Sequence, residues 1–190
     1  CNRDVLLGTS HLFTRDVFCF WEDRGEVRMQ LKPHAPGIRK FSEQALTAKA
    51  RTIIKSMRAS KDSGKAVMFY SCIIGSIPGQ TATAIKVADT FVRSLRERLD
   101  QVFIINPAEY FEPGMDGDDL MFMWEQVQRS GLINIWRFQS MEDIEASFGL
   151  MGLKVPPVWS GKDATFSTGC TKEMRIALDM QRSHPELQIV

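Results

Sequence analysis

A turn with two glycines and a proline follows the most apolar stretch of the chain. Residues 66–74 form this apolar run, and the turn after it carries Gly75, Ser76, Pro78 and Gly79. Such a run is typical of a strand that is buried on both faces of a parallel sheet. Glycine lets the backbone approach a ligand closely, and a helix that follows directly would offer free N–H groups at the same bend. The sequence therefore predicts a small-ligand site at the carboxyl edge of an α/β sheet.

Helix and strand patterns alternate on both sides of this turn. Apolar residues recur at helical spacing in several segments, and short apolar runs lie between them. The predicted strands are 66–74, 102–105, 132–138, 154–159 and 186–190, and the predicted helices are 42–59, 81–99, 118–130, 140–148 and 171–181. This alternation predicts an α/β, Rossmann-like fold with a mostly parallel sheet and helices on both faces.

The N-terminal part of the chain has a different pattern. Residues 17–21 and 26–31 read as strands and flank a short turn that contains Gly25, which predicts a β-hairpin. We therefore expect a hairpin extension over 1–38 and a Rossmann-like domain over 39–190. Because the chain begins with cysteine rather than methionine, we also expect it to be a piece of a longer protein.

The residues after the turn exclude two common nucleotide-binding motifs. Gly79 is followed by Gln80 and Thr81, so the turn lacks the Gly-Lys-Ser/Thr sequence of a Walker phosphate loop. The glycine spacing of the dinucleotide-binding fingerprint is absent as well. A tight turn without a cation suits a neutral or zwitterionic group, such as the amino-acid end of S-adenosylmethionine.

The turn resembles a motif of a known enzyme family. Gly75-Ser-Ile-Pro-Gly79, placed after an apolar strand, is similar to the first motif of the FtsJ-like RNA ribose 2′-O-methyltransferases, especially of their poxvirus-type cap-modifying members. The order of predicted elements over 42–190 matches that family too. The resemblance implies that the turn holds S-adenosylmethionine and that the substrate is RNA.

The resemblance also implies roles for residues outside the turn. Asn106, at the end of the second predicted strand, takes the place of the acid that binds the cofactor ribose, and Phe138 ends the third strand beside the cofactor. Lys49 takes the place of the first catalytic lysine, with Lys55 as the alternative. Asp163 lies nearest to the expected catalytic aspartate. A lysine of lowered pKa beside an acid could activate a ribose hydroxyl.

The sequence departs from the family at three places. Asn106 carries no charge, Ser160 stands where the fourth strand should present the catalytic aspartate, and the family's second lysine and glutamate would fall at or beyond Val190. Either the domain over 39–190 is truncated at its C-terminus, or it has lost this chemistry, so a second hypothesis stands beside the methyltransferase. In that hypothesis the chain is a non-catalytic Rossmann-like module that serves structure or interaction in a larger assembly, such as a viral one.

Charge is sorted along the chain although the net charge is only +1. Residues 32–65 hold nine Lys or Arg against two acids, and residues 103–150 hold nine acids against two Arg. Such sorting favours RNA binding by the basic 32–65 region and a protein partner on the acidic 103–150 region. The alternative for each charge is an ordinary solvated helix surface.

The cysteines and histidines do not predict a metal site. The four cysteines form no CxxC pair, and the three histidines are scattered. Reduced, buried thiols suit a reducing compartment, so we expect an intracellular location, either cytoplasmic or virion-associated. No apolar run approaches the length of a membrane span, and no signal-peptide pattern opens the chain.

Overall fold

The fold is described from a computed structural model of the chain, for residues 41–190. The hairpin expected within residues 17–31 and the boundary expected at residue 38 lie outside the described residues. Among the described residues, no helix combines the length and the apolar character that a membrane crossing requires.

Four parallel strands form the sheet of the described region. They are β1 (Ala66–Ser71), β2 (Val102–Ile105), β3 (Ile135–Phe138) and β4 (Gln188–Ile189), in the order β2-β1-β3-β4. Residue Phe69 of β1 pairs with Ile105 of β2 on one side and with Trp136 of β3 on the other. The winding direction reverses between β1 and β3, and in open α/β sheets ligands bind at the carboxyl ends of the strands beside such a reversal.

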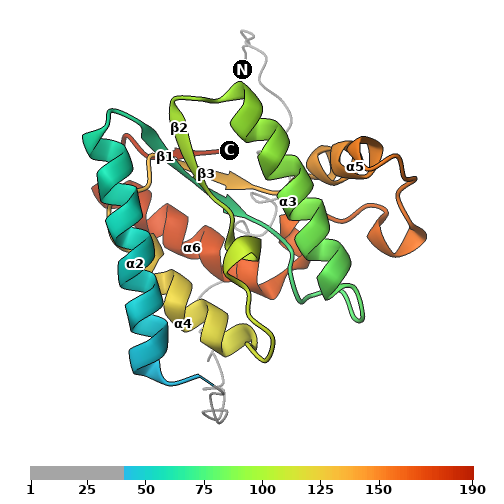
Figure 1. Ribbon diagram of the computed structural model, residues 1–190, viewed down its shortest axis with the longest axis horizontal. Coiled ribbons are helices and arrows are strands. Elements are labelled where there is room, and N and C mark those ends of the chain that lie inside the picture. Colours follow the sequence, from blue (N-terminus) through green and yellow to red (C-terminus); the bar gives the residue numbers. More distant parts are fainter. Residues whose placement is uncertain (1–40) are drawn as a thin grey trace, which may run out of the picture. The chain divides into compact units, whose positions relative to one another are not determined.

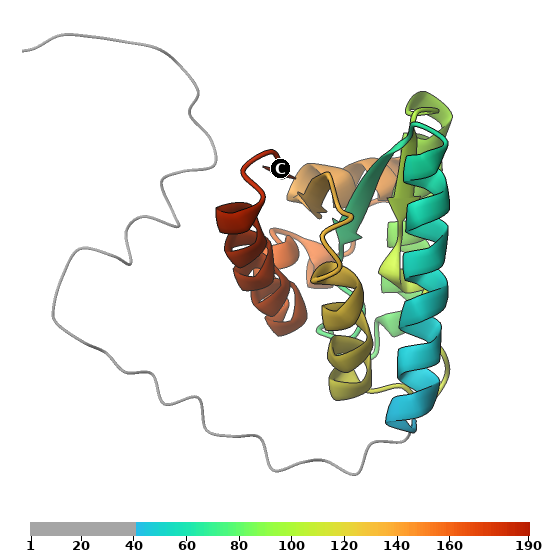
Figure 2. The ribbon, with the colours of Figure 1, turned by 90° about the vertical axis from the view of Figure 1, so that its left-hand side faces the viewer.

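Helices cover both faces of this sheet (Figures 1 and 2). Helices α2 (Glu43–Asp62), α4 (Gly117–Gln128) and α6 (Thr168–Ser183) pack with Phe69 and Trp136 in one core. Helix α3 (Thr81–Arg98) packs on the opposite face, against Tyr70, and α5 (Met141–Leu150) lies beside α3. The α/β, Rossmann-like architecture predicted from the sequence is therefore confirmed.

Polar side chains begin the helices, largely where the sequence predicts them. The Ser42 hydroxyl accepts a hydrogen bond from the Ala45 N–H at the start of α2, and Ser140 forms a capping box with Asp143 at the start of α5. Helix α4 was expected to be capped by Asp118 or Asp119. Its N-cap is Asp116 instead, because Asp119 fills the third helical position of a second capping box.

The strand predicted over 154–159 is wrong. Residues Pro157–Trp159 form a short 3₁₀ helix, η2, after Pro156, because proline has no N–H to donate to a strand ladder. The strand predicted over 186–190 forms as β4, beside β3. Helix α6 begins three residues earlier than predicted, since the Ser167 hydroxyl caps it by accepting a hydrogen bond from the Cys170 N–H.

An aromatic cluster holds the centre of the larger core. The ring of Phe69 meets the rings of Trp124 and Trp136 edge to face, at centroid distances of 5.4 and 5.3 Å. Each such pair adds about 1 kcal/mol beyond the burial of its surface. The cluster ties α4 to β1 and β3 and so fixes the walls of the site described next.

Candidate functional site

A cavity of about 420 Å³ lies at the carboxyl ends of β1 and β2, between the first turns of α4 and α6. Its size is in the range of small-molecule sites. Its walls come from the segment after β1, the start of the short helix η1 (Pro107–Tyr110), helix α4 with the loop before it, and the start of α6. The lining residues are Cys72, Ile74, Gly75, Ser76, Thr81, Pro107, Phe111, Met115, Asp116, Gly117, Leu120, Met121, Trp124, Ser167, Thr168, Gly169, Cys170 and Glu173.

The turn singled out in the sequence contributes half of its predicted residues to this cavity. Gly75 and Ser76 line it, whereas Pro78 and Gly79 are not among the lining residues. Gly79 has a backbone φ of +69°, which residues other than glycine rarely adopt. Glycine at this position therefore allows the chain to bend. The Ser76 hydroxyl donates a hydrogen bond to the Ser167 hydroxyl at 2.9 Å, which joins the turn to the start of α6.

The most unusual group in the cavity is the carboxylate of Glu173. The residue is only 6% exposed, yet it belongs to the cavity lining. Its Oε2 accepts a short hydrogen bond from the Ser71 hydroxyl, and its Oε1 accepts one from the Gln128 Nε2 at 2.8 Å. Two neutral donors from β1 and α4 therefore hold one buried carboxylate in place.

Burial raises the pKa of Glu173 to about 7, although the hydrogen bonds from Ser71 and Gln128 lower it. The group therefore exists in both protonation states near neutral pH. A carboxyl group of this kind in a cavity can serve as a general acid, a general base or a nucleophile.

Sequence reasoning missed Glu173, although the sequence contains a signal for it. Helix α6 buries Cys170, Ile176 and Ala177, and Glu173 falls on the same face at helical spacing. An acid in the middle of an otherwise apolar helix stripe is costly to bury unless it has partners. That position could have been picked out as a candidate site residue.

Two thiols also line the cavity and remain protonated. Burial raises the pKa of Cys170 to about 12 and raises the pKa of Cys72 well above its ordinary value, and the nearby Glu173 adds to both shifts. Because the thiolate is the nucleophilic form, these cysteines act as small apolar wall groups. Among the described residues, no group of three His, Cys, Asp or Glu side chains is arranged to hold a metal ion.

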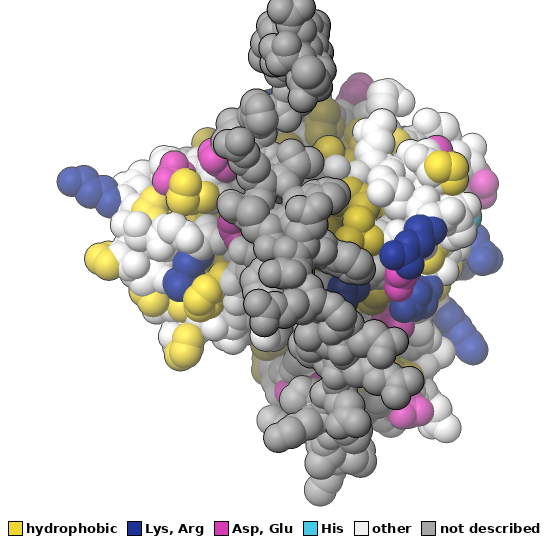
Figure 3. All heavy atoms as spheres, turned by 180° about the vertical axis from the view of Figure 1, so that it is seen from behind, with side chains coloured by type: hydrophobic (Ala, Val, Ile, Leu, Met, Phe, Trp, Pro, Cys, Tyr) yellow, Lys and Arg dark blue, Asp and Glu magenta, His cyan; other side chains and the backbone are white. Residues whose placement is uncertain are grey.

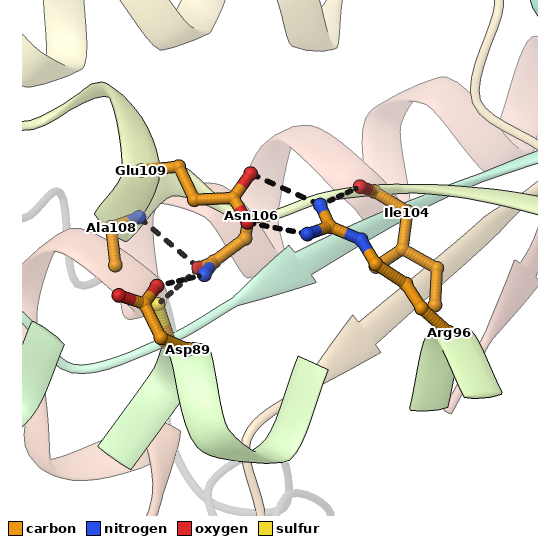
Figure 4. A network of polar contacts seen from close by, with 7 residues as sticks. Asp89, Arg96, Ile104, Asn106, Ala108 and Glu109 are labelled. Carbon is orange, nitrogen blue, oxygen red and sulfur yellow. Dashed lines mark hydrogen bonds and ion pairs between the residues drawn. The ribbon is translucent and has the colours of Figure 1, made fainter. Parts of the chain in front are cut away.

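Asn106, predicted to bind the cofactor ribose, is fully buried just beyond β2 (Figure 4). Its Oδ1 accepts a hydrogen bond from the Ala108 N–H at 3.1 Å, and its Nδ2 donates to Asp89 at 2.6 Å. It does not line the cavity, but its neighbours Cys72 and Pro107 do. The amide fits this place because a carboxylate there would oppose Asp89.

A salt bridge beside Asn106 fastens η1 to α3 (Figure 4). Arg96 donates to both carboxylate oxygens of Glu109, at 2.5 and 3.0 Å, and to the backbone carbonyl of Ile104 at 2.8 Å. A bidentate pair of this kind fixes the relative orientation of the guanidinium and the carboxylate as well as the distance between them. The link holds the segment that carries Pro107 at the edge of the cavity.

The other predicted site residues lie away from the cavity lining. Lys49 forms a short ion pair with Glu112, and the Asp163 carboxylate caps the short helix η3 (Ala164–Phe166) by accepting a hydrogen bond from the Thr165 N–H at 2.8 Å. Phe138 stacks on Trp136 in the core, with ring centroids 6.2 Å apart. None of the three predicted residues lines the cavity, so the structure brings neither predicted catalytic residue into it.

Some charged side chains of both segments have polar partners or are buried where the structure describes them. In α2, Lys49 pairs with Glu112 and Lys61 donates to the Asn134 side chain, while in 103–150 Asp119 and Asp143 are buried. On the face seen in Figure 3, Lys and Arg side chains stand among acidic and apolar ones.

No family model, curated protein or solved structure matches the chain.

Proposed function

We propose that the chain is an enzyme that cleaves or transfers a glycosidic bond of a nucleoside-type substrate, with Glu173 as its nucleophile. The observation that carries this proposal is the buried carboxylate of Glu173 in the cavity lining, held by Ser71 and Gln128. Strand β1 and helix α4 supply these two donors and keep the carboxylate in a single place.

A buried carboxylate suits this reaction because the transition state resembles an oxocarbenium ion. One Glu173 oxygen attacks the anomeric carbon while the bond from that carbon to the base nitrogen breaks, and the electron pair leaves with the base, which takes a proton from water. Water or a second base then attacks the anomeric carbon of the glycosyl ester and releases the carboxylate. The Ser71 hydroxyl and the Gln128 amide hold the carboxylate in position for both steps.

The cavity walls favour a substrate with a flat base and a sugar. The apolar side chains of Phe111, Met121 and Trp124 offer a surface for a base, and the hydroxyls of Ser76 and Ser167 offer partners for sugar oxygens. Among the described lining residues there is no Lys or Arg. A compact nucleoside therefore suits the cavity better than a polyphosphate.

Binding of S-adenosylmethionine, and with it methyl transfer to RNA, is a second candidate function. The presence of Gly75 and Ser76 in the lining favours it, and this cofactor also carries a nucleoside. Since Lys49 and Asp163 do not line the cavity, the residues that activate the acceptor hydroxyl would have to be others.

A substrate screen tests the first proposal. Purified protein is incubated with a panel of nucleosides and nucleoside monophosphates, and release of free base is followed by chromatography. We expect release by the wild type and a loss of about 10³-fold or more in Glu173→Gln, because an amide cannot act as the nucleophile. Glu97→Gln, an exposed change on α3, is the matched control and should behave as the wild type. Calorimetric binding of S-adenosylmethionine without any base release would favour the second candidate.

A further inference from the structure

A second and much smaller cavity lies beside Gln128, the residue that donates to Glu173. Its volume is about 10 Å³, and its lining includes Gln128, Gly131, Trp136 and His184. That volume is close to what a single buried water molecule needs, roughly 10–15 Å³ on the same measure, together with two or more polar partners. Gln128 is the residue that links this cavity to Glu173, because its Nε2 donates to the Glu173 carboxylate.

Two residues that line the small cavity carry an unpaired donor and an unpaired acceptor. The Trp136 Nε1 and the Gln128 Oε1 are both buried, and neither has a hydrogen-bond partner among the described residues. Indole N–H can only donate, and the amide oxygen can only accept. A water molecule accepts from one and donates to the other, and the His184 ring in the same lining can serve as its third partner.

We propose that one water molecule binds between Trp136 and Gln128 and holds the Gln128 amide with its nitrogen toward Glu173, which makes Gln128 a positioning residue for that carboxylate. The proposal rests on the function proposed for Glu173, but its geometry can be tested separately.

The orientation of the Gln128 amide matters because its two ends suit different states of Glu173. With the nitrogen toward Glu173, as in the 2.8 Å bond, the amide donates to the carboxylate and supports its ionised form. With the oxygen toward Glu173, it can accept only from a protonated carboxyl. A water that donates to Oε1 selects the first orientation, and it therefore favours the ionised, nucleophilic form.

Among the described residues, no cationic side chain is a cause of the Glu173 pKa shift, so none stabilises its ionised form in place of these hydrogen bonds. The titratable groups beside it are the thiols of Cys72 and Cys170, which burial keeps protonated. The ionised form is therefore supported by the Ser71 hydroxyl and the Gln128 amide. Removal of either donor should raise the pH at which Glu173 loses its proton.

The test is a titration of the Glu173 carboxyl by ¹³C NMR in glutamate-labelled protein, assigned with Glu173→Gln. In Gln128→Met, which keeps the length of the side chain and removes the amide, we expect the titration midpoint to rise by about one pH unit. In Trp136→Phe, which removes the indole N–H but keeps a ring, we expect a smaller rise in the same direction. Gln126→Met, two residues away on α4, should leave the midpoint unchanged. The water itself should give a nuclear Overhauser signal to the Trp136 indole proton.

The outcomes separate this inference from the proposed function. A raised midpoint in both Gln128→Met and Trp136→Phe supports the positioning role. The acidic limb of the pH–rate profile for base release should then move to higher pH by the same amount. An unchanged midpoint in Gln128→Met overturns the inference even if base release is observed. A raised midpoint together with no base release by any variant supports the positioning role and contradicts the proposed function.

Discussion

Glu173 is a carboxylic acid in the middle of a buried helix face, and its burial has a measurable energetic cost. Its pKa is about 7 in the folded protein, against an ordinary value of 4.5. The folded state therefore binds a proton that the unfolded state releases between these two pH values, so stability falls as the pH rises through this window. Strongly raised carboxyl pKa values of this kind cluster at functional sites.

Replacement of Glu173 by glutamine should remove this pH dependence. Relative to Glu173→Gln, we expect the free energy of unfolding of the wild type to fall by about 3 kcal/mol between pH 4.5 and 7, since one pKa unit corresponds to about 1.4 kcal/mol. Urea unfolding at a series of pH values, followed by circular dichroism, measures this difference. Parallel pH profiles for the two proteins would mean that the Glu173 pKa is not raised. Glu97→Gln serves as the exposed control.

Asn106 is a second residue for which a neighbouring side chain explains why an amide, and not a carboxylate, stands there. Its Nδ2 donates to Asp89, whose pKa is raised by burial. In Asn106→Asp two carboxylates would meet, and we expect the protein to lose about 2 kcal/mol of stability at pH 7, because a hydrogen bond becomes a repulsion. The loss should shrink toward pH 4, where one carboxyl takes up a proton. The double variant Asp89→Asn/Asn106→Asp should restore stability, and failure to do so would argue against this pairing.

At the scale of elements, the N-terminal turn of α6 connects the site to the fold. Ser167 caps this helix, and its hydroxyl also accepts the hydrogen bond from Ser76 in the turn after β1. Helix α6 in turn carries both Cys170 and Glu173 into the cavity. A change at the cap should therefore affect both stability and the site.

Removal of the Ser167 hydroxyl tests that connection. We expect Ser167→Ala to lower the free energy of unfolding by about 1 kcal/mol, the usual value of an N-cap. It should also weaken ligand binding, because the Ser76 hydroxyl loses its partner. Chemical denaturation and calorimetry measure the two effects. Ser183→Ala, at the other end of α6, should change neither. Equal effects from both variants would contradict the account.

Much of the fold could be predicted from the sequence because its signals are local. Helical spacing and the Ser42 and Ser140 caps placed α2 and α5, and the apolar run before Gly75 placed β1. The errors arose where a short apolar segment competes with proline, as in 157–159, and where two aspartates near Asp116 could each serve as the cap.

The candidate site was harder to predict, because it depends on contacts between distant segments. Gly75 and Ser76 could be predicted from the turn chemistry of a single segment. The carboxylate of Glu173 meets Ser71 across 102 positions of the chain, and no spacing rule connects them. The roles expected for Lys49 and Asp163 rest on a family resemblance, and neither residue lines the cavity.

At the scale of the whole molecule, the basic and acidic segments of the sequence meet within the described residues. The ion pair between Lys49 on α2 and Glu112 in the loop before α4 joins the basic segment to the acidic one, and further acids are buried or paired. RNA binding by 32–65 and protein binding by 103–150 therefore remain proposals that rest on the exposed remainder of these charges.

The exposed cations of α2 offer a test of RNA binding. We expect the wild type to bind single-stranded RNA at low salt, and the triple variant Arg51→Gln/Lys55→Gln/Arg58→Gln to bind more weakly with a shallower salt dependence. The log–log slope should fall by about 0.7 for each phosphate that the variant no longer neutralises. Fluorescence anisotropy over a salt series measures both the affinity and the slope. Arg93→Gln on α3 is the control. Identical slopes for the wild type and the triple variant would exclude α2 from RNA binding.

The central claim is that Glu173 forms a bond to the anomeric carbon of the substrate, and one measurement tests it most directly. Protein that is releasing base from a nucleoside is quenched in acid, digested with pepsin and analysed by mass spectrometry. The account predicts a glycosyl adduct on the peptide that contains Glu173, and its absence in Glu173→Gln. Base release that continues undiminished in Glu173→Gln, with no adduct in either protein, would contradict it.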